Sequence, residues 1–354
     1  MFYHIANALR PHCNILNLFH YVSFRSIAAL LTSILFSFIF GNWFIKATQD
    51  RFKSKPRKWT PENHLTKNNT PTMGGIFILM VCVVNTLLWN NLTKKNIWVF
   101  LFCIISFGSI GFLDDLLKLR RSKGISAKLK FSLQFIFSAA TMILWYFWVN
   151  PNTMLCIPFF KNITPTLGLL MIPWGMFILM GTSNAVNLTD GLDGLATGPL
   201  MANFSTFAFI AYLTGHKFFS KYLHIVYSGN AEMTIVCTTL LGALIGFLWY
   251  NTYPAQIFMG DVGSLALGAT LGLVALITRQ ELLLPIAGGI FVLETLSVII
   301  QLGSYRFLGR RMFKMAPIHH HFELVGWKEA KITVRFWIIS IILSLIALLT
   351  LKIR

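Results

Sequence analysis

The stretch Asn184-Ala-Val-Asn-Leu-Thr-Asp-Gly-Leu-Asp-Gly-Leu-Ala-Thr-Gly198 places two carboxylates and three glycines between two long apolar runs. The run before it covers Leu167 to Gly181, and the next one begins at Pro199. Asp190 and Asp193 lie three residues apart, so any helical turn here would bring both carboxylates to one face. Oxygen ligands placed in this way suit a hard cation such as Mg²⁺, whereas the alternative is a polar turn between helices.

The whole chain repeats this alternation of long apolar runs and polar connections. Its 354 residues are 55% hydrophobic and only 12% charged, and a mean hydropathy of +0.66 is too apolar for an ordinary soluble domain. Each run of about 17 to 25 apolar residues can cross roughly 30 Å of hydrocarbon as a helix. The sequence therefore predicts an all-α integral membrane protein that forms a single polytopic domain over residues 1–354.

Ten such runs predict a bundle of about ten transmembrane helices, and an even number of spans puts both termini on the same side. The predicted spans are Ser26–Ile45, Gly74–Asn90, Ile97–Leu113, Phe131–Val149, Leu167–Gly181, Pro199–Leu213, Met233–Tyr250, Val262–Thr278, Leu282–Leu302 and Phe336–Leu351.

Basic residues set the predicted orientation. Twenty of the thirty Lys and Arg residues lie in three connections, 46–67, 118–130 and 306–335, which fall on one side of the predicted bundle. The positive-inside rule makes that side cytoplasmic, so both termini face outward. The net charge of +18 thus follows from large basic cytoplasmic loops and indicates no nucleic-acid partner.

Five aspartates gather on the same cytoplasmic side, although they come from distant parts of the sequence. All of them lie at span ends or in connections, and they are Asp114, Asp115, Asp190, Asp193 and Asp261. Two cytoplasmic connections lack any Lys or Arg, and these are the ones that carry Asp190, Asp193 and Asp261. The sequence therefore predicts an active site at the cytoplasmic face of the membrane.

The segment from Ile110 to Lys118 ends the third predicted span with adjacent Asp114 and Asp115. Neighbouring residues on a helix point about 100° apart, so these two carboxylates are not expected to chelate one ion together. We expect one to face the site as a base or ligand, and the other to pair with Lys118, Lys130 or backbone. The alternative is an interfacial charge pair within the basic loop, although carboxylates at membrane depth usually have a role.

Asp261 lies between Gly260 and Gly263, where the eighth predicted span begins. A lone aspartate at a helix start is most often an N-cap. Here it is a further carboxylate on the same membrane face, so we treat it as a candidate ligand. Phe258 offers a ring that could stack on a base, although packing is the commoner role of a lone aromatic.

Two further segments supply cations and hydroxyl groups at the same membrane level. Lys67 and Thr72 belong to the connection before the second span, which is otherwise typical of a cap and turn. The last large loop contains His319, His320 and His321. These histidines could bind zinc or donate hydrogen bonds to phosphate, and the sequence does not decide between the two. Successive histidines do not share one helix face, so a three-ligand metal site would need an irregular loop.

Together these residues favour phosphoryl transfer at the bilayer surface. Carboxylates suit Mg²⁺, cations suit phosphate oxygens, and glycines allow close approach. A substrate with a long apolar tail would explain why the site belongs to a membrane bundle. The competing class is a transporter or lipid flippase, which should carry charge near the bilayer midplane, where only Glu294 is placed.

Five motifs are the basis of a family resemblance, and they are Thr70-Pro-Thr-Met-Gly-Gly, Phe112-Leu-Asp-Asp, Asn184-Ala-Val-Asn-Leu-Thr-Asp-Gly-Leu-Asp-Gly-Leu, Gly260-Asp-Val-Gly-Ser and Pro317-Ile-His-His-His-Phe-Glu. With them the chain resembles the phospho-N-acetylmuramoyl-pentapeptide transferases over its whole length. The aspartate motifs are shared more widely among polyprenyl-phosphate sugar-1-phosphate transferases, whereas the histidine segment points to the muramoyl-pentapeptide branch.

The resemblance implies an Mg²⁺-dependent phosphoglycosyl transferase of the bacterial inner membrane that acts in peptidoglycan synthesis. Such an enzyme transfers phospho-N-acetylmuramoyl-pentapeptide from UDP-MurNAc-pentapeptide to undecaprenyl phosphate, giving lipid I and UMP. By similarity, Asp261 is the Mg²⁺ ligand, Asp114 a candidate base for the lipid phosphate and Asp115 a supporting carboxylate. Residues that would line the nucleotide and phosphate pocket are Lys67, Thr72, Asn187, Asp190, Asp193, Phe258, His319, His320 and His321.

Several alternatives stay open at the level of sequence. The lipid phosphate attacks the donor directly, or a covalent aspartyl intermediate forms first. Direct attack needs fewer groups, because a phosphate monoester is already largely ionised. A GlcNAc-1-phosphate transferase of the same superfamily is the nearest rival. The third residue of the pentapeptide and the oligomeric state, a homodimer included, are left open.

Overall fold

A computed structural model describes residues 1–49, 70–121, 123–160 and 163–352. Within these ranges the chain forms helices joined by loops, and no strand longer than an isolated bridge is present. The longer helices are α2 (Val22–Gln49), α3 (Gly74–Trp89), α4 (Lys95–Arg121), α5 (Ala127–Leu144), α6 (Met171–Thr189), α7 (Thr197–Gly215), α9 (Glu232–Asn251), α10 (Gly260–Thr278), α12 (Gly289–Leu308) and α14 (Glu329–Thr350). The shorter ones are α1 (Phe2–Leu9), α8 (Lys217–Leu223), α11 (Leu284–Ala287) and α13 (Ile318–Leu324).

Eight helices among the described residues are long and apolar enough to cross a membrane, which confirms the all-α integral membrane class. α3 is also apolar but has only 16 residues. α7 is not among the eight, because its 19 residues include Asn203 and three threonines. The total of ten spans therefore stays a prediction.

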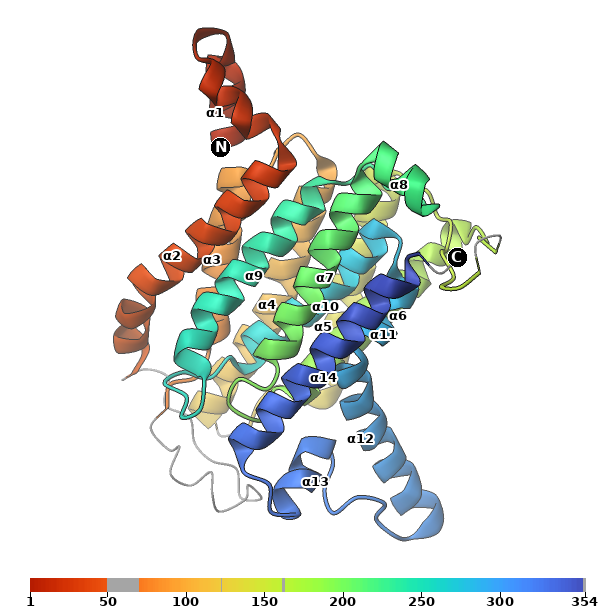
Figure 1. Ribbon diagram of the computed structural model, residues 1–354. Coiled ribbons are helices and arrows are strands. Elements are labelled where there is room, and N and C mark those ends of the chain that lie inside the picture. The colour runs from red at the N-terminus through yellow and green to blue at the C-terminus, as the bar shows by residue number, and fades with distance from the viewer. Residues whose placement is uncertain (50–69, 122, 161–162, 353–354) are drawn as a thin grey trace.

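The centre of the bundle is α10. Every residue from Val262 to Thr278 is buried, and the helix packs against α3, α4, α6 and α7 (Figure 1). Close packing with α4 depends on Gly111, because a Cβ there would lie 2.2 Å from the carbonyl oxygen of Asp261. The missing side chain allows two backbones to approach at the level where α10 begins.

The ninth predicted span, Leu282–Leu302, is wrong as a single continuous helix. The chain forms a short turn over Glu281–Leu283 and then α11, and a new helix, α12, begins at Gly289. Paired glycines at positions 288 and 289 explain the break, since such pairs commonly interrupt helices. Figure 1 shows α12 leaning away from the bundle, with its C-terminal end beyond α13.

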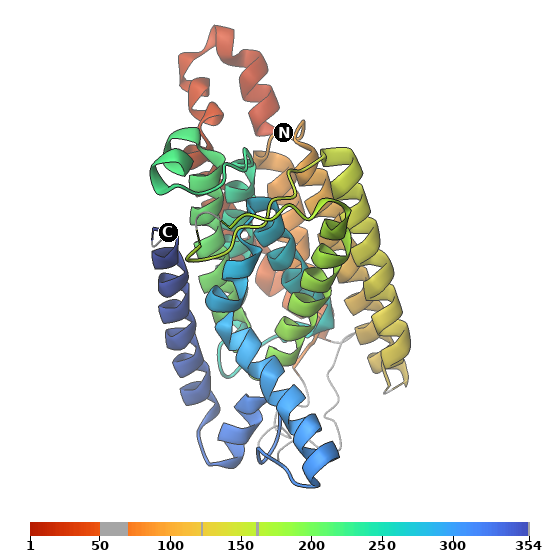
Figure 2. The same cartoon turned by 90° about the vertical axis from the view of Figure 1, so that its right-hand side faces the viewer.

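The two ends of the chain lie towards the same end of the bundle. The N-terminal helix α1 and the C-terminal end of α14 both lie away from α13 in the two views (Figures 1 and 2). The connections that follow α6 and α9 lie towards the end that α13 occupies (Figure 1). The first of these connections carries Asp190 and Asp193, and the second leads to Asp261 in the first turn of α10.

Candidate active site

Three carboxylates from two packed helices form the centre of the site. Asp114 and Asp115 lie in the C-terminal part of α4, and Asp261 lies in the first turn of α10. One oxygen from each lies within 4.8 Å of the others, with Asp114 and Asp115 buried and Asp261 half-buried. The fold thus brings together carboxylates that are separated by about 150 residues in sequence. A single active site that contains all three requires this closeness.

Two lysine ammonium groups lie among these carboxylates. Lys118 Nζ is 2.8 Å from Asp114 Oδ2 and 3.3 Å from Asp115 Oδ1. The same ammonium is 3.0 Å from Asp261 Oδ2. Lys130 Nζ, which comes from α5, is 2.5 Å from Asp261 Oδ2 and 3.5 Å from Asp114 Oδ2. Two ammonium groups against three carboxylates leave a net negative charge, which favours an additional cation.

The expectation that only one of the adjacent aspartates faces the site is wrong. Each uses one oxygen for a backbone amide and the other for Lys118. Asp114 Oδ1 accepts from the amide of Ile125 at 2.8 Å, and Asp115 Oδ2 accepts from the amide of Val262 at 3.3 Å. Lys118 lies four and three residues after them on the same helix, so its long side chain reaches both.

Asn187 connects α6 to this cluster. Its Nδ2 donates to Asp261 Oδ1 at 3.1 Å and to Ser264 Oγ at 2.8 Å. Thr72 lies next to the cluster through Gly260, whose φ is +73°. A Cβ on Gly260 would lie 2.5 Å from Asp115 Oδ2 and 3.2 Å from Thr72 Oγ1. A side chain at this position would therefore separate the threonine hydroxyl from the carboxylates.

Asp190 and Asp193 would share one face only on a helical turn, and the loop after α6 does not form one. α6 ends at Thr189, and residues 190–196 form turns instead of continuing the helix. Asp193 is buried, and its Oδ2 accepts from the amide of Ala255 at 3.0 Å. Its own amide donates to Glu329 Oε1 at 2.8 Å. Asp193 thus holds the loop to α14 and to the connection after α9.

Asp190 instead lies within electrostatic reach of the carboxylate cluster. Burial, and then repulsion from the carboxylates of Asp261 and Asp115, raises the pKa of Asp190 from 3.8 to about 8. The folded protein therefore keeps a proton on this group over a pH range in which the unfolded chain releases it. Strongly perturbed carboxyl groups of this kind cluster at functional sites.

The pH dependence of stability should reveal this proton. Because the folded pKa is raised, the free energy of unfolding falls as pH rises between about 4 and about 8. Asp190→Asn abolishes that titration. The melting temperature of the variant minus that of the wild type should therefore increase steadily as pH rises from about 4 to about 8. Thermal unfolding in detergent without divalent cations measures the difference, and a gap that is constant with pH would contradict the assignment.

The connection before α3 lies against the segment that precedes α10. The amide of Phe258 donates to the carbonyl of Pro71 at 2.9 Å, and its carbonyl accepts from the amide of Gly74 at 2.8 Å. These bonds hold Thr72 and Phe258 on neighbouring segments. Stacking of the half-buried Phe258 ring on a base stays a prediction. Lys67 lies outside the described residues.

The three histidines lie on α13 and have different partners. His319 is buried, and its Nδ1 lies 3.0 Å from Glu294 Oε1. His320 Nδ1 lies 2.7 Å from Glu323 Oε2, and His321 Nδ1 accepts from the amide of Lys314 at 3.1 Å. The rings of His319 and His320 lie 4.2 Å apart, but the three histidines are not among the groups of described residues close enough to hold one metal ion. Hydrogen bonding to phosphate stays a prediction for these residues.

The residues of the cluster fit a hard divalent cation. Among the described residues, Asp114, Asp115 and Asp261 are the group of three ligand side chains close enough to hold one ion. All three offer carboxylate oxygens, which Mg²⁺ prefers, usually with one or two carboxylates and the rest of its shell from water and phosphate. The two ammonium groups already compensate much of the negative charge of the carboxylates. The site is therefore compatible both with a bound cation and with none.

Sequence reasoning missed several residues that build the site. Asn251 Oδ1 accepts from the amide of Gly194 and from Thr197 Oγ1, and Trp337 Nε1 donates to the carbonyl of Gly194 at 3.0 Å. Glu329 likewise binds the loop from 136 residues away. No local spacing in the sequence signals these pairings, because each joins segments that meet only in the folded bundle.

Comparison with known proteins agrees with this arrangement. The model of glycosyl transferase family 4 matches residues 97–279, and phospho-N-acetylmuramoyl-pentapeptide-transferase signature 1 matches residues 67–79. The chain is 50% identical over 359 residues to the phospho-N-acetylmuramoyl-pentapeptide-transferase of Desulfosudis oleivorans, with both chains fully covered. It is 48% identical over 358 residues to the enzyme of that name from Citrifermentans bemidjiense, again with full coverage of both chains.

The chain belongs to the phospho-N-acetylmuramoyl-pentapeptide transferases. It is therefore a membrane-embedded transferase of peptidoglycan synthesis. The matched part of glycosyl transferase family 4 begins within α4 and ends just after α10, so it contains the three clustered carboxylates and both lysines. The signature covers Thr72 and the start of α3.

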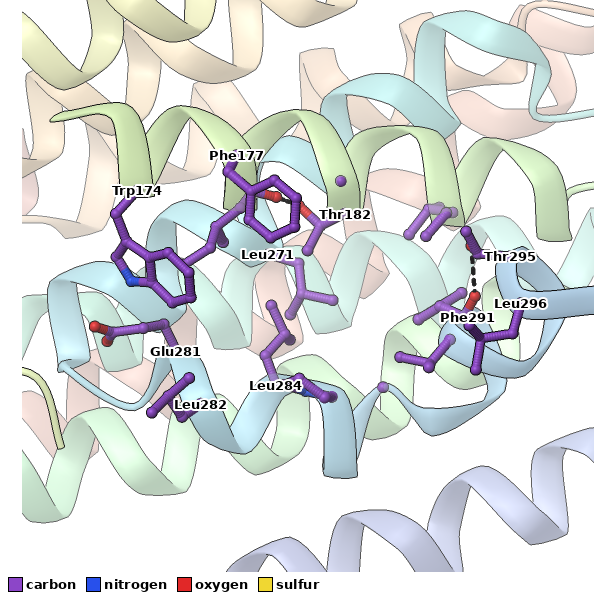
Figure 3. Close-up of a pocket in the computed structure, with 17 residues that line it drawn as sticks. Trp174, Phe177, Thr182, Leu271, Glu281, Leu282, Leu284, Phe291, Thr295 and Leu296 are labelled. Carbon is purple, nitrogen blue, oxygen red and sulfur yellow. Dashed lines mark hydrogen bonds between the residues drawn. The ribbon is translucent and has the colours of Figure 1, made fainter. Parts of the chain in front are cut away.

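The transferase also has an apolar cavity beside α6. Its volume is about 250 Å³, and it lies between α6, α10 and the α11–α12 segment (Figure 3). Trp174, Phe177 and Phe291 are among the residues that line it, and Glu281 is a polar exception at one end. The lining continues along α6 to Val186, the residue before Asn187. The cavity thus extends to the part of α6 that also carries Asn187.

Proposed function

We propose that the chain transfers phospho-N-acetylmuramoyl-pentapeptide from UDP-MurNAc-pentapeptide to undecaprenyl phosphate, producing lipid I and UMP with Mg²⁺ as cofactor. The observation that supports this most directly is the cluster of Asp114, Asp115 and Asp261 with two lysines. Negative oxygens suit the cation, and ammonium groups suit the transferring phosphate. The name of both relatives supports the same donor group.

We further propose ten spans in the bacterial inner membrane, with both termini outside and the active site at the cytoplasmic face. The distribution of Lys and Arg supports this orientation, since twenty of thirty lie in the connections on that side. α1 and the end of α14 lie away from α13, as this topology requires (Figure 1). α3 and α7 would complete the ten spans, because they pack within the same bundle.

For the donor, Asp261 is the proposed Mg²⁺ ligand, with Asp115 beside it. The bound ion would stabilise negative charge on the diphosphate oxygens. Lys118 and Lys130 are free to exchange their carboxylate partners for phosphate oxygens, because their side chains are 29% and 19% exposed. Asn187 orients the Asp261 carboxylate through the hydrogen bond to Oδ1.

For the acceptor, the apolar cavity beside α6 is the proposed place for the polyprenyl tail. Its apolar lining suits an isoprenoid, and Val186 brings it next to Asn187. Direct attack by the acceptor phosphate is the favoured route, because a phosphate monoester needs little help from a base. Both oxygens of Asp114 already have partners, which supports a positioning role over covalent attack.

The test is release of UMP by purified protein mixed with UDP-MurNAc-pentapeptide, undecaprenyl phosphate and Mg²⁺. We expect release that requires all three additions. A parallel reaction with UDP-GlcNAc should release little UMP, whereas efficient release there would favour the GlcNAc-1-phosphate transferase alternative. Translocation of the lipid without UMP would instead support a flippase and overturn the proposal.

A further inference from the structure

A buried pair of side chains joins α12 to α13 close to the loop that carries Asp190. His319 Nδ1 lies 3.0 Å from Glu294 Oε1, and the two side chains are only 1% and 0% exposed. This distance is that of one hydrogen bond between the imidazole and the carboxyl group. Since protein encloses both partners, the hydrogen bond fixes the orientation of the imidazole ring.

The other edge of the same ring lies against Gly191. A Cβ on Gly191 would lie 2.2 Å from His319 Nε2 and 2.8 Å from Cε1, so the imidazole occupies the space of a side chain. Among the described residues, Nε2 has no hydrogen-bond partner, so packing alone determines this contact. The ring is therefore held between a carboxylate of α12 and the residue that follows Asp190.

α12 uses two faces for two different regions. Phe291, Val292 and Thr295 line the apolar cavity, whereas Glu294 points to His319. Hydrogen bonds from α9, α14 and the connection after α9 act on Asp193 and Gly194. The amides of Asp190 and Gly191 donate to carbonyls at the end of α6. The start of the loop, at Asp190 and Gly191, is thus the part that rests on His319.

We propose that Glu294 and His319 are positioning residues that hold the Asp190 turn in a fixed place relative to α12. This inference rests on the proposed function, in which the cavity lined by α12 takes the acceptor tail and the carboxylate cluster near Asp190 binds the donor. The pair acts through Gly191 and needs no contact with substrate. It links the helix of the acceptor cavity to the turn beside the carboxylate cluster.

Two substitutions break this link from opposite sides. Glu294→Leu removes the hydrogen-bond partner of Nδ1, and Gly191→Ala displaces the ring from the loop. Each is expected to lower kcat for UMP release by about a hundredfold, since small displacements at a reacting centre have effects of that size. The double variant should lose no more than the stronger single variant, because both break one connection.

Two further variants test the specificity of this effect. Glu294→Gln keeps an amide oxygen that accepts from Nδ1, so it should retain a rate close to that of the wild type. Ser297→Ala is the matched control, because its buried hydroxyl donates within α12 to the carbonyl of Glu294. Its kcat should equal that of the wild type.

Hydrogen–deuterium exchange provides a readout that does not depend on activity. Glu294→Leu and Gly191→Ala should both speed exchange in residues 190–196 and leave peptides of α9 and α10 unchanged. Unchanged exchange in that loop, faster exchange throughout the bundle, or additive losses of kcat would overturn the inference. If wild-type protein releases no UMP, the proposed function fails, while the exchange result still decides whether the pair holds the turn.

Discussion

Asp261→Asn is expected to lower the rate of UMP release by about a thousandfold, because it would weaken the binding of the metal ion that stabilises negative charge on the transferring phosphate. Asp261 contacts Lys118, Lys130 and Asn187. It also lies close to the carboxylates of Asp114 and Asp115. Asparagine has nearly the same shape, but it removes the negative charge that the proposed Mg²⁺ needs. UMP release measured over a series of Mg²⁺ concentrations gives both the maximal rate and the dependence on the ion.

The matched control for this experiment lies further along the same helix. Thr270 is buried in α10, and its hydroxyl donates to carbonyls of that helix. Thr270→Ala should therefore keep the rate of the wild type. If Asp261→Asn retained the full rate at low Mg²⁺, the assignment of Asp261 as the metal ligand would be wrong.

Gly111→Ala is expected to have the second large effect, on both stability and rate. The new Cβ would lie 2.2 Å from the carbonyl oxygen of Asp261 and 2.5 Å from Cα of Val262. Backbone atoms cannot rotate away, so α4 and α10 must separate, at a cost of about 1–3 kcal/mol or more. The same separation moves Asp261 away from Asp114 and Asp115, and activity should fall by about a hundredfold.

A second glycine provides the control for this substitution. Gly303 lies in α12, and a Cβ there would meet no atom within 4 Å. Because alanine favours helices over glycine by about 1 kcal/mol, Gly303→Ala should leave the melting temperature unchanged or raise it slightly. Thermal unfolding together with UMP release distinguishes the two variants. Equal behaviour of Gly111→Ala and Gly303→Ala would show that the contact between α4 and α10 does not position Asp261.

Hydrophobic run length predicted most of the fold, because a helix that crosses a bilayer needs about 20 apolar residues. It failed at the ninth span, where the run continues through Gly288 and Gly289 but the helix does not. The hydropathy of a run does not predict where its helix is interrupted, since a bent segment can be as apolar as a straight one. The glycine pair and Pro285 are the only local signals of that break in the sequence.

The site was predictable in its membership and less so in its geometry. Charges on one predicted membrane face pointed to Asp114, Asp115 and Asp261, and the fold brings these three together. Reasoning from helix angles separated Asp114 from Asp115, because it gave Lys118 to only one of them, whereas its long side chain reaches both. Longer-range partners such as Glu329 could not be predicted, because their pairing depends on how helices pack.

The complete burial of α10 has a consequence for the way the protein responds to its lipid environment. A bilayer that is too thin or too thick acts on helices that contact acyl chains, which tilt or bend to reduce the mismatch. Residues 262–278 have no exposed side chain, so this helix is insulated from such forces by the helices around it. Changes in membrane thickness should therefore be absorbed at the perimeter, while the separation between Asp261 and α4 stays constant.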